Sequence, residues 1–543
     1  MARKSRRGKS CSAHSRGRSL SPQSARRGKL NRKGAKAAKK NRKTLRSWRL
    51  RDSFECVNVD HRLSQTRWYE EWFASGTRAG VVAVLLLCVA LGGVMGALVG
   101  WIGPLYAVAG VAALAAALLM LRSVHVGLVA VIAVICLLPF AAVPLPIGFS
   151  PTFLDLVLVA VYVVWLFRMA ERRQRDFIAT PVALPLLLFI VLAVAAFVAG
   201  LAHSRISANV LRHFAEVIMA LALFYVIANT VRTGEQLKWV VRAIIVAGFI
   251  AASLGVVFYY IPQNLTIRIL SALGRFNYPT GADVIQYIED DPSLPMRAIS
   301  TSVNPNLLGS LMILITSVTV AQLFAKQPAL PRWVLWGMVP FMGLCLYLTY
   351  SRGSLLGLAV GLALIGALRY RKLLLLMALV GIVFLLLPST QAYIAHLVEG
   401  VRGEDLATQM RFGEYKDALT LISRYPWLGV GFVGTPDIDL YIGVSNVYLM
   451  IAEQMGLVGL ALFLVVMAVV FASFWRGWRR MTQPDYEPVL MGFVAALAGI
   501  MFGGLLDHYF FNLDFPHSIS FFWIYVGLAV VSARLAEGKA VTT

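Results

Sequence analysis

The sequence predicts an all-α membrane protein: a polytopic helical bundle of about 14 transmembrane helices (about 12–14), with a long, partly helical external loop. Of the 543 residues, 58% are hydrophobic and only 14% are charged, whereas roughly 25% of a soluble domain is charged. Apolar runs long enough to cross about 30 Å of hydrocarbon recur from Gly80 to the C-terminus. Helices are expected because the backbone polar groups in lipid must be satisfied within the chain.

A basic arm is expected to occupy residues 1–79, ahead of a membrane domain at 80–543. Residues 1–51 contain 20 Lys and Arg and no Asp or Glu, and so carry most of the net charge of +24. This composition predicts a largely disordered cytoplasmic segment that is attracted to anionic lipid. RNA binding or docking of a partner is the alternative, but no aromatic residues alternate with the basic ones, so we expect no specific nucleic-acid partner.

Fourteen apolar segments are expected to span the membrane. With the basic arm in the cytoplasm, alternation places five basic loops on the cytoplasmic side, at 168–175, 231–238, 326–332, 369–372 and 475–480. The loops on the other side are poor in Lys and Arg, which predicts an even number of spans and two cytoplasmic termini. The segments lie near 80–101, 103–122, 126–143, 151–168, 181–202, 208–230, 237–261, 304–326, 331–350, 354–369, 373–389, 446–472, 488–506 and 517–535.

Two external loops are long, at 262–303 and 390–445. Loops longer than about 12–15 residues are usually functional or disordered, and the aromatic and apolar residues in both of these argue against disorder. In the second loop, apolar residues recur at helical spacing between Phe412 and Ile422. This spacing predicts an amphipathic helix on the outer surface.

Ionisable residues cluster near the expected outer boundary, where their cost in lipid makes them candidates for a site. Arg212 and Glu216 are four residues apart and share a helix face. Arginines gathered at one surface suit a phosphate or diphosphate, because a guanidinium binds such oxygens in a bidentate fork. The candidates are Arg212, His213, Glu216, Arg297, Asn304, Asn306, Arg352, Arg411, His508 and His517.

Each candidate also has a purely structural interpretation. An arginine at a helix end often only extends its charge to the interface, and Arg212 with Glu216 could be a packing ion pair. Asn304 followed by Pro305 is typical of a helix start, with the asparagine as the cap. An isolated external histidine is more often structural than catalytic. We therefore base the prediction of a site on the convergence of these residues at one face.

The stretch SNVYLMIAEQMGLVGL opens a span with the polar pair Ser445 and Asn446 and carries Glu453 within about two turns. Gly456 and Gly459 predict a surface for close helix packing. Glu453 is expected to be an internal hydrogen-bond partner.

The cysteines give no sign of a disulfide or a metal site. No CxxC pair and no His/Cys cluster occurs, and no cysteine falls in the long external loops. We expect no metal and no cofactor.

Four segments, in this order, resemble the O-antigen ligase and polymerase superfamily: RAISTSVNPNLLGS, YSRGSLLGL, RYPWLGVGF and SNVYLMIAEQMGLVGLALFL. These families are integral membrane glycosyltransferases that take glycans from undecaprenyl-diphosphate carriers at the outer face. The resemblance covers roughly residues 120–535, and its pattern is specific from 297 to 464. It implies a helical bundle, a large external loop with catalytic residues and no metal requirement.

The resemblance also implies roles for individual residues. Arg352 matches the family's arginine in a serine-arginine-glycine turn, and Arg411 matches a loop arginine ahead of the YPWLGVG segment. Both are implied to bind the diphosphate of the carrier. Asn446, Gly456 and Gly459 match a family signature of His-Asn, nine residues and Gly-x-x-Gly.

Ser445 stands where that signature has histidine, which in ligases is the implied general base. A serine hydroxyl has too low a proton affinity to serve unaided at neutral pH. The substitution favours a polymerase over a conventional lipid A-core ligase, or means that another group is the base. The sequence leaves that base open among Glu216, Glu414, Asp417, His508 and His517.

Together these observations predict a polysaccharide polymerase that joins undecaprenyl-diphosphate-linked repeat units by inverting transfer at the outer face of a bacterial cytoplasmic membrane. Arg352 and Arg411 would stabilise the departing diphosphate, while Ser445 and Asn446 would position the acceptor hydroxyl. A ligase that moves finished glycan to a lipid, protein or wall acceptor is the nearest alternative, and a lipid-linked glycan flippase is an alternative of another class. The expected partners are the lipid-linked glycan, membrane lipid, and a chain-length regulator or flippase.

Overall fold

The computed structural model describes residues 119–120, 123–143, 150–171, 177–202, 206–403, 406–434 and 443–539, together with scattered helical residues between 82 and 100. The expected basic arm lies outside the described residues, as do most of the two spans expected at 80–101 and 103–122. Contacts divide the chain into residues 1–111 and 112–543, and the description below concerns the second unit.

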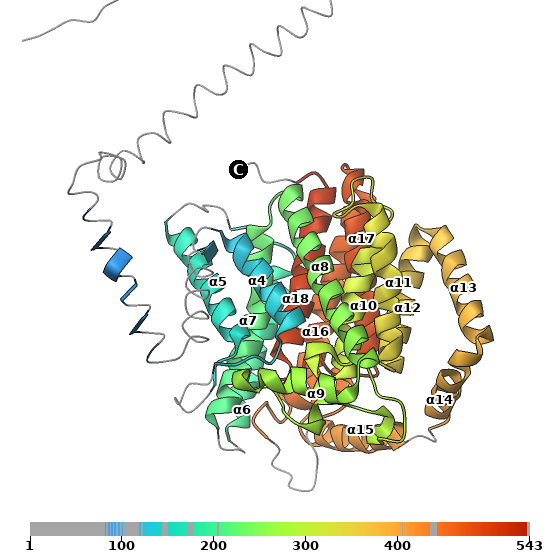
Figure 1. The fold of residues 1–543 in the computed structure, drawn as a ribbon. Coiled ribbons are helices and arrows are strands. Elements are labelled where there is room, and N and C mark those ends of the chain that lie inside the picture. The colour runs from blue at the N-terminus through green and yellow to red at the C-terminus, as the bar shows by residue number, and fades with distance from the viewer. Residues whose placement is uncertain are drawn as a thin grey trace, which may run out of the picture. The chain divides into compact units, whose positions relative to one another are not determined.

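The described part of this unit is helical, and its β-structure is limited to two isolated bridges. The helices, labelled as in Figure 1, are α4 (Val124–Leu137), α5 (Phe153–Ala170), α6 (Ala183–Gly200), α7 (Ala208–Thr230), α8 (Gly234–Tyr260), α9 (Gln263–Ser271), α10 (Pro305–Gln322), α11 (Arg332–Leu348), α12 (Arg352–Leu368), α13 (Arg371–Leu386), α14 (Gln391–Arg402), α15 (Leu406–Arg424), α16 (Val447–Arg479), α17 (Glu487–Gly503) and α18 (Pro516–Ala536).

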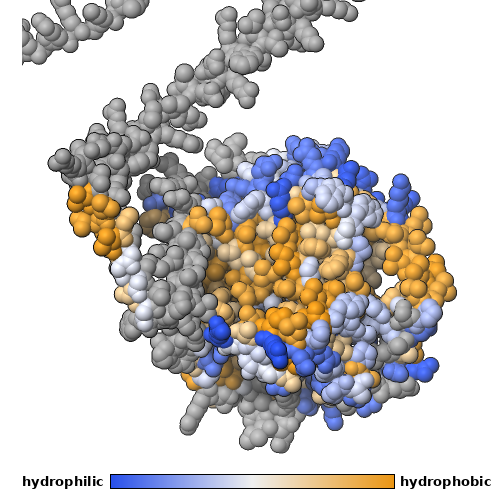
Figure 2. Space-filling view, viewed as in Figure 1, coloured by the Kyte–Doolittle hydropathy of each residue, from blue (hydrophilic) through white to orange (hydrophobic). Residues whose placement is uncertain are grey.

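The expected membrane bundle is confirmed as a class, while the number of spans is not. Within the described residues, eight helices are long and apolar enough to cross a membrane, and three shorter apolar helices, α4, α11 and α12, accompany them. Each expected span from 126–143 onward corresponds to a helix, including α13 at 371–386. Figure 2 shows an apolar band across these helices between two more polar faces. The protein is a multi-pass membrane protein.

Helices α10 and α18 form the centre of the bundle. In each, 94% of the most apolar 18-residue window is buried, because neighbouring helices surround them. Helix α18 packs against α7, α16 and α17, and α10 packs against α8, α11, α12 and α17. Helix α13 lies at the periphery, as Figure 1 shows, and most of its side chains are exposed, as expected for a helix that faces lipid.

Side-chain caps fix the start of several helices at one end of the bundle. Thr152 and Asp155 form a capping box at α5, and Asn304 accepts a hydrogen bond from Leu307 N at α10, with Pro305 in the first turn. Asn446 caps α16 by accepting from the backbone N–H groups of the next turn. The expectation that Asn304 is a helix cap is confirmed. Because helix N-termini carry partial positive charge, this end of the bundle favours anions.

The two long loops are ordered over most of their length. Loop 262–303 contains α9 and four short 3₁₀ turns. Loop 390–445 contains two helices, α14 and α15, where the sequence predicted one helix between Phe412 and Ile422. In Figure 1, α9 and α15 lie across the same end of the bundle, and α15 contributes Arg411 to the site described below.

Helix α16 is broken at Gly456, which has a φ of 70° and a ψ of 179°. The break separates the carbonyls of Glu453 and Gln454 from the amides that would bond them in a continuous helix. Those carbonyls accept hydrogen bonds from Val430 N at 2.9 Å and Gly431 N at 3.1 Å. Leu457 N, released in the same way, donates to the carbonyl of Pro426 at 2.8 Å. The segment 426–431 therefore replaces the missing turn of α16.

Glycines make this close backbone approach possible. A Cβ on Gly456 would lie 2.1 Å from the carbonyl oxygen of Trp427, and one on Gly429 would lie 2.3 Å from that of Glu453. Both glycines also have positive φ, where other residues are strained. The predicted packing surface of Gly456 and Gly459 differs in the structure, because the break at Gly456 interrupts the helix face that they were expected to share.

We expect Gly456→Ala to lower the apparent melting temperature of the purified protein in detergent by several degrees. A φ of 70° with a ψ of 179° is a backbone conformation essentially restricted to glycine and costs another residue roughly 1–3 kcal/mol, and the contact with Trp427 adds to that. Gly343→Ala on α11 is the matched control, because a Cβ at Gly343 meets nothing within 4 Å. Equal melting temperatures for the two variants would contradict the proposed requirement for glycine.

Candidate functional site

The end of the bundle where α5, α10, α12, α16 and α18 begin contains two separate cavities. We call the first the arginine cavity. It has a volume of about 90 Å³ and is lined by Ile288, Glu289, Arg297, Asn306, Tyr350, Ser351, Arg352, Gly353, Arg411 and Asp507. Three guanidinium groups face two carboxylates, so the lining has a net positive charge.

The three arginines of this cavity come from three distant parts of the chain. Arg297 belongs to loop 262–303, Arg352 is the first residue of α12, and Arg411 lies in α15. Their convergence was predicted from the sequence as a cluster at one face, and the structure places all three on one cavity. Within the described residues, no carboxylate forms an ion pair with Arg411 or Arg297.

Arg297 is held firmly by its neighbours. Its Nε donates to the carbonyl of Thr349 at 2.8 Å, and its Nη2 donates to Asn306 Oδ1 at 2.5 Å. Burial lowers the pKa of Arg297 to about 10, with nearby Tyr509 and Asp507 opposing the shift. The guanidinium therefore remains charged at neutral pH.

A strained turn positions Arg352. Tyr350, between α11 and α12, has a φ of 53°, which is uncommon for a residue with a side chain. The turn allows α12 to start two residues later, with Arg352 at its N-terminus. The side chain of Arg352 passes so close to Gly400 of α14 that a Cβ there would lie 1.8 Å from Nη1. The ring of Tyr393 packs against that of Tyr350 in a tilted arrangement, with centroids 5.5 Å apart, and holds α14 beside this turn.

Asp507 is one of the two carboxylates of the arginine cavity, and the sequence singled out neither it nor Glu289. It directly follows the short turn after α17 and precedes His508, whose backbone N–H donates to Asp507 Oδ1 at 3.0 Å. Burial raises the pKa of Asp507, while His508, Arg411 and Arg297 act in the opposite direction. The only sequence signal for Asp507 was an acidic residue at the mouth of an apolar span.

The second cavity, which we call the polar cavity, has a volume of about 530 Å³. Its polar lining includes Ser150, Thr152, Arg212, His213, Glu216, Asn277, Asp283, Gln286, Ser302, Asn304, Asp514 and His517.

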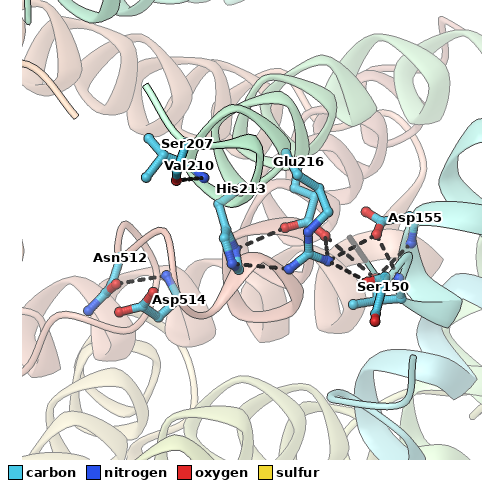
Figure 3. A network of polar contacts seen from close by, with 10 residues as sticks. Ser150, Asp155, Ser207, Val210, His213, Glu216, Asn512 and Asp514 are labelled. Atoms are coloured by element: carbon cyan, nitrogen blue, oxygen red, sulfur yellow. Dashed lines mark hydrogen bonds and ion pairs between the residues drawn. The ribbon is translucent and has the colours of Figure 1, made fainter. Parts of the chain in front are cut away.

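Figure 3 shows the ionic network at one wall of the polar cavity. Arg212 Nη1 lies 3.3 Å from both Asp155 Oδ2 and Glu216 Oε1, and His213 Nδ1 lies 3.2 Å from Glu216 Oε2. Glu216 is fully buried. The expected pairing of Arg212 with Glu216 is confirmed, and Asp155 is a partner that the sequence did not indicate.

The start of α10 separates the two cavities. Asn304 lines the polar cavity and accepts a hydrogen bond from the hydroxyl of Tyr509 at 3.1 Å. Asn306, two residues later, lines the arginine cavity and accepts from Arg297. One helix N-terminus thus contributes an amide side chain to each cavity.

Residues 337–464 match the model of the Wzy_C family, described as O-antigen ligase. This part of the chain is an O-antigen ligase domain. The match identifies a membrane enzyme of the O-antigen ligase and polymerase type, which transfers lipid-linked glycans in polysaccharide biosynthesis. No curated protein matches the chain.

The O-antigen ligase domain contributes only part of the arginine cavity. Arg352 and Arg411 lie within the matched residues, whereas Arg297 and Asp507 lie on either side of them. The break in α16 and the segment 426–431 that fills it both lie inside the domain. The domain thus supplies two guanidinium groups, and the surrounding chain supplies the third together with both carboxylates, Glu289 and Asp507.

Other predicted site residues make hydrogen bonds with backbone groups at and near the start of α16. Glu414 Oε2 accepts a hydrogen bond from Ser445 N at 2.8 Å, and Asn446 Nδ2 donates to the carbonyl of Leu505 at 2.9 Å. His508 Nδ1 lies 3.3 Å from the carbonyl of Val444. These contacts tie α15 and the loop after α17 to the start of α16. Ser445, Asn446, Glu414 and His508 do not line the arginine cavity.

The described residues show no group of three or more His, Cys, Asp or Glu side chains placed to hold a metal ion. Their cysteines, Cys88, Cys136 and Cys345, are free thiols.

We expect Glu414→Gln to retain activity, because a glutamine oxygen can still accept the Ser445 N–H. Glu414→Ala should destabilise the protein by about 1–3 kcal/mol, the usual cost of leaving a partly buried donor without a partner. Melting temperature and glycan transfer, measured on the same preparations, check both expectations. A loss of transfer in Glu414→Gln with unchanged stability would instead indicate that the carboxylate acts as a base.

Proposed function

We propose that the protein is a polymerase that joins undecaprenyl-diphosphate-linked repeat units of a polysaccharide by inverting glycosyl transfer. The observation that carries this proposal is the meeting of Arg297, Arg352 and Arg411 at one cavity at the end of a membrane bundle that contains an O-antigen ligase domain.

Charge supports a diphosphate as the ligand of the arginine cavity. Three guanidinium groups, each able to bind two oxygens, exceed the two carboxylates of the lining. The N-termini of α10 and α12 meet there as well, and both add partial positive charge. A volume of about 90 Å³ suits a small anionic group, so the sugars and the prenyl chain of the carrier would lie outside this cavity.

The transfer step follows from these groups. An acceptor hydroxyl oxygen attacks the anomeric carbon of the donor, the bond from that carbon to the diphosphate oxygen breaks, and the diphosphate departs with the electron pair. The arginines stabilise the charge that develops on the diphosphate, which needs no proton to leave. Attack opposite to the leaving group inverts the anomeric centre.

We assign Asp507 as the base that takes the proton of the acceptor hydroxyl. Two carboxylates line the arginine cavity, and Glu289 is exposed, whereas Asp507 is half-buried and close enough to Arg411 and Arg297 for their charges to act on its pKa. A carboxyl group whose pKa is raised by burial is a stronger base than an ordinary aspartate. Glu414 and His508 do not line the arginine cavity and contact the backbone of Ser445 and Val444, which favours a positioning role for both.

The membrane orientation belongs to the proposal. We place the arginine cavity on the external face and both termini in the cytoplasm. Basic residues at the opposite end of the bundle support this orientation through the positive-inside rule. They include Arg168, Arg232, Arg332, Arg369, Arg476 and Arg479.

A ligase is the second candidate, because the matched family is described as O-antigen ligase. Ser445 favours the polymerase, since it stands where the ligase signature has a histidine base. Loss of a polymerase and loss of a ligase leave different glycans on the lipid carrier, and the prediction for the arginine variants below uses that difference.

We expect Arg352→Ala and Arg411→Ala to abolish glycan transfer in cells, with normal amounts of protein in the membrane. If the protein is a polymerase, single repeat units should accumulate on the lipid carrier; if it is a ligase, long carrier-linked polymer should accumulate. Extraction and electrophoresis of lipid-linked glycans distinguish the two. Arg402→Ala is the matched control, since Arg402 is exposed on α14 and lines neither cavity.

Normal amounts of finished glycan, with no build-up of lipid-linked glycan in either arginine variant, would contradict the diphosphate-binding role of this cavity.

We expect the rate of transfer by the purified protein to fall as the pH is lowered, because Asp507 must be deprotonated to act as the base. The fall should begin at a pH above the ordinary aspartate pKa of about 3.9. The raised pKa moves this loss to higher pH. Asp507→Asn should lower the rate by about 10²–10⁴ and remove this acidic limb. Asp291→Asn, an exposed acid of loop 262–303, serves as the control. A wild-type pH profile in Asp507→Asn would overturn the assignment of the base.

A further inference from the structure

We propose that the polar cavity binds the sugar of the acceptor glycan, and that it accepts neutral and amino sugars while excluding acidic ones. The role of this sugar as an acceptor rests on the proposed function. The binding preference itself rests on the polar cavity and is measurable without any transfer reaction.

The charge of the polar cavity is opposite in sign to that of the arginine cavity. Three carboxylates line it, from Glu216, Asp283 and Asp514, against a single arginine, Arg212. That arginine is already paired with Asp155 and Glu216, each at 3.3 Å. An additional anion in this cavity would therefore meet uncompensated negative charge, whereas an ammonium group would find carboxylates.

Buried polar groups without partners also point to a ligand with hydroxyl groups. His517 is only 1% exposed and lines the cavity, and its Nε2 has no hydrogen-bond partner within the described residues. Asp155 Oδ1, close to the same wall, lacks a partner as well. Buried polar atoms are normally satisfied, so a ligand that can both donate and accept hydrogen bonds fits this site.

The remaining lining suits the shape of a sugar ring. The rings of Phe140 and Phe515 lie on one side, and Phe140 packs edge-on against His517 at 5.0 Å between ring centroids. Apolar surface with a few fixed polar groups is typical of small-molecule pockets. A volume of about 530 Å³ lies within the usual range of roughly 300–1,000 Å³ for such pockets.

The position of the polar cavity suits an acceptor. Asn304 and Asn306, two residues apart at the start of α10, line the polar and the arginine cavity respectively. A sugar in the polar cavity thus lies next to the groups that would hold the donor diphosphate. The opposite charges of the two cavities would keep the donor phosphates out of the acceptor site.

The test is saturation-transfer NMR on the full-length protein in lipid nanodiscs, with glucosamine, N-acetylglucosamine and glucuronic acid as probes of similar size. We expect the first two to bind and glucuronic acid to bind at least about five-fold more weakly, which is the effect of one unit charge about 4 Å away at the dielectric constant of bulk water. Asp283→Asn combined with Asp514→Asn should weaken glucosamine binding and reduce the discrimination against glucuronic acid. Both aspartates are exposed, so the substitutions should not impair folding.

Two controls separate this inference from the proposed function. Asp291→Asn removes an exposed acid that lines neither cavity and should leave sugar binding unchanged. Arg352→Ala should abolish transfer and also leave sugar binding unchanged. Equal binding of glucuronic acid, or no effect of the double variant, would overturn the inference. Sugar binding as expected in a protein that transfers no glycan would instead overturn the proposed function and leave the binding preference intact.

Discussion

The exchange of backbone hydrogen bonds at the break of α16 is the interaction on which the site depends. Inside a membrane, a freed carbonyl or amide is costly unless the chain itself supplies a partner. Val430 N, Gly431 N and the carbonyl of Pro426 supply those partners. This constraint fixes the position of segment 426–431, and with it the end of α15, so that Arg411 is anchored to the same framework as α16.

A second set of contacts extends this framework across the face of the bundle. Glu414 accepts a hydrogen bond from the N–H of Ser445. Asn446 caps α16 and donates to a carbonyl of the turn after α17. His508 lies beside the carbonyl of Val444. Asp507 follows that same turn. The signature residues at the start of α16 therefore organise the loops that carry Arg411 and Asp507, and they act on the site through the backbone.

Two cavities of opposite net charge lie at this face, separated by the start of α10, and each suits a different reactant. A net positive cavity suits the leaving diphosphate, whose developing charge must be stabilised. A net negative cavity with unpartnered buried groups suits a hydroxyl-bearing sugar. The membrane bundle holds these sites next to each other, which reduces the loss of translational and rotational freedom in bringing donor and acceptor together.

The sequence by itself determined the helical membrane class, a helix for each expected span from 126–143 to 517–535, the cap at Asn304 and the gathering of arginines at one face. These follow from local composition, periodicity and charge, which need no knowledge of neighbours. Only the tertiary structure decided that Arg297 joins Arg352 and Arg411, that Asp507 shares their cavity, and that Gly456 breaks its helix. Those features depend on contacts between segments more than 50 residues apart or on backbone conformation, and neither leaves a periodic pattern in the sequence.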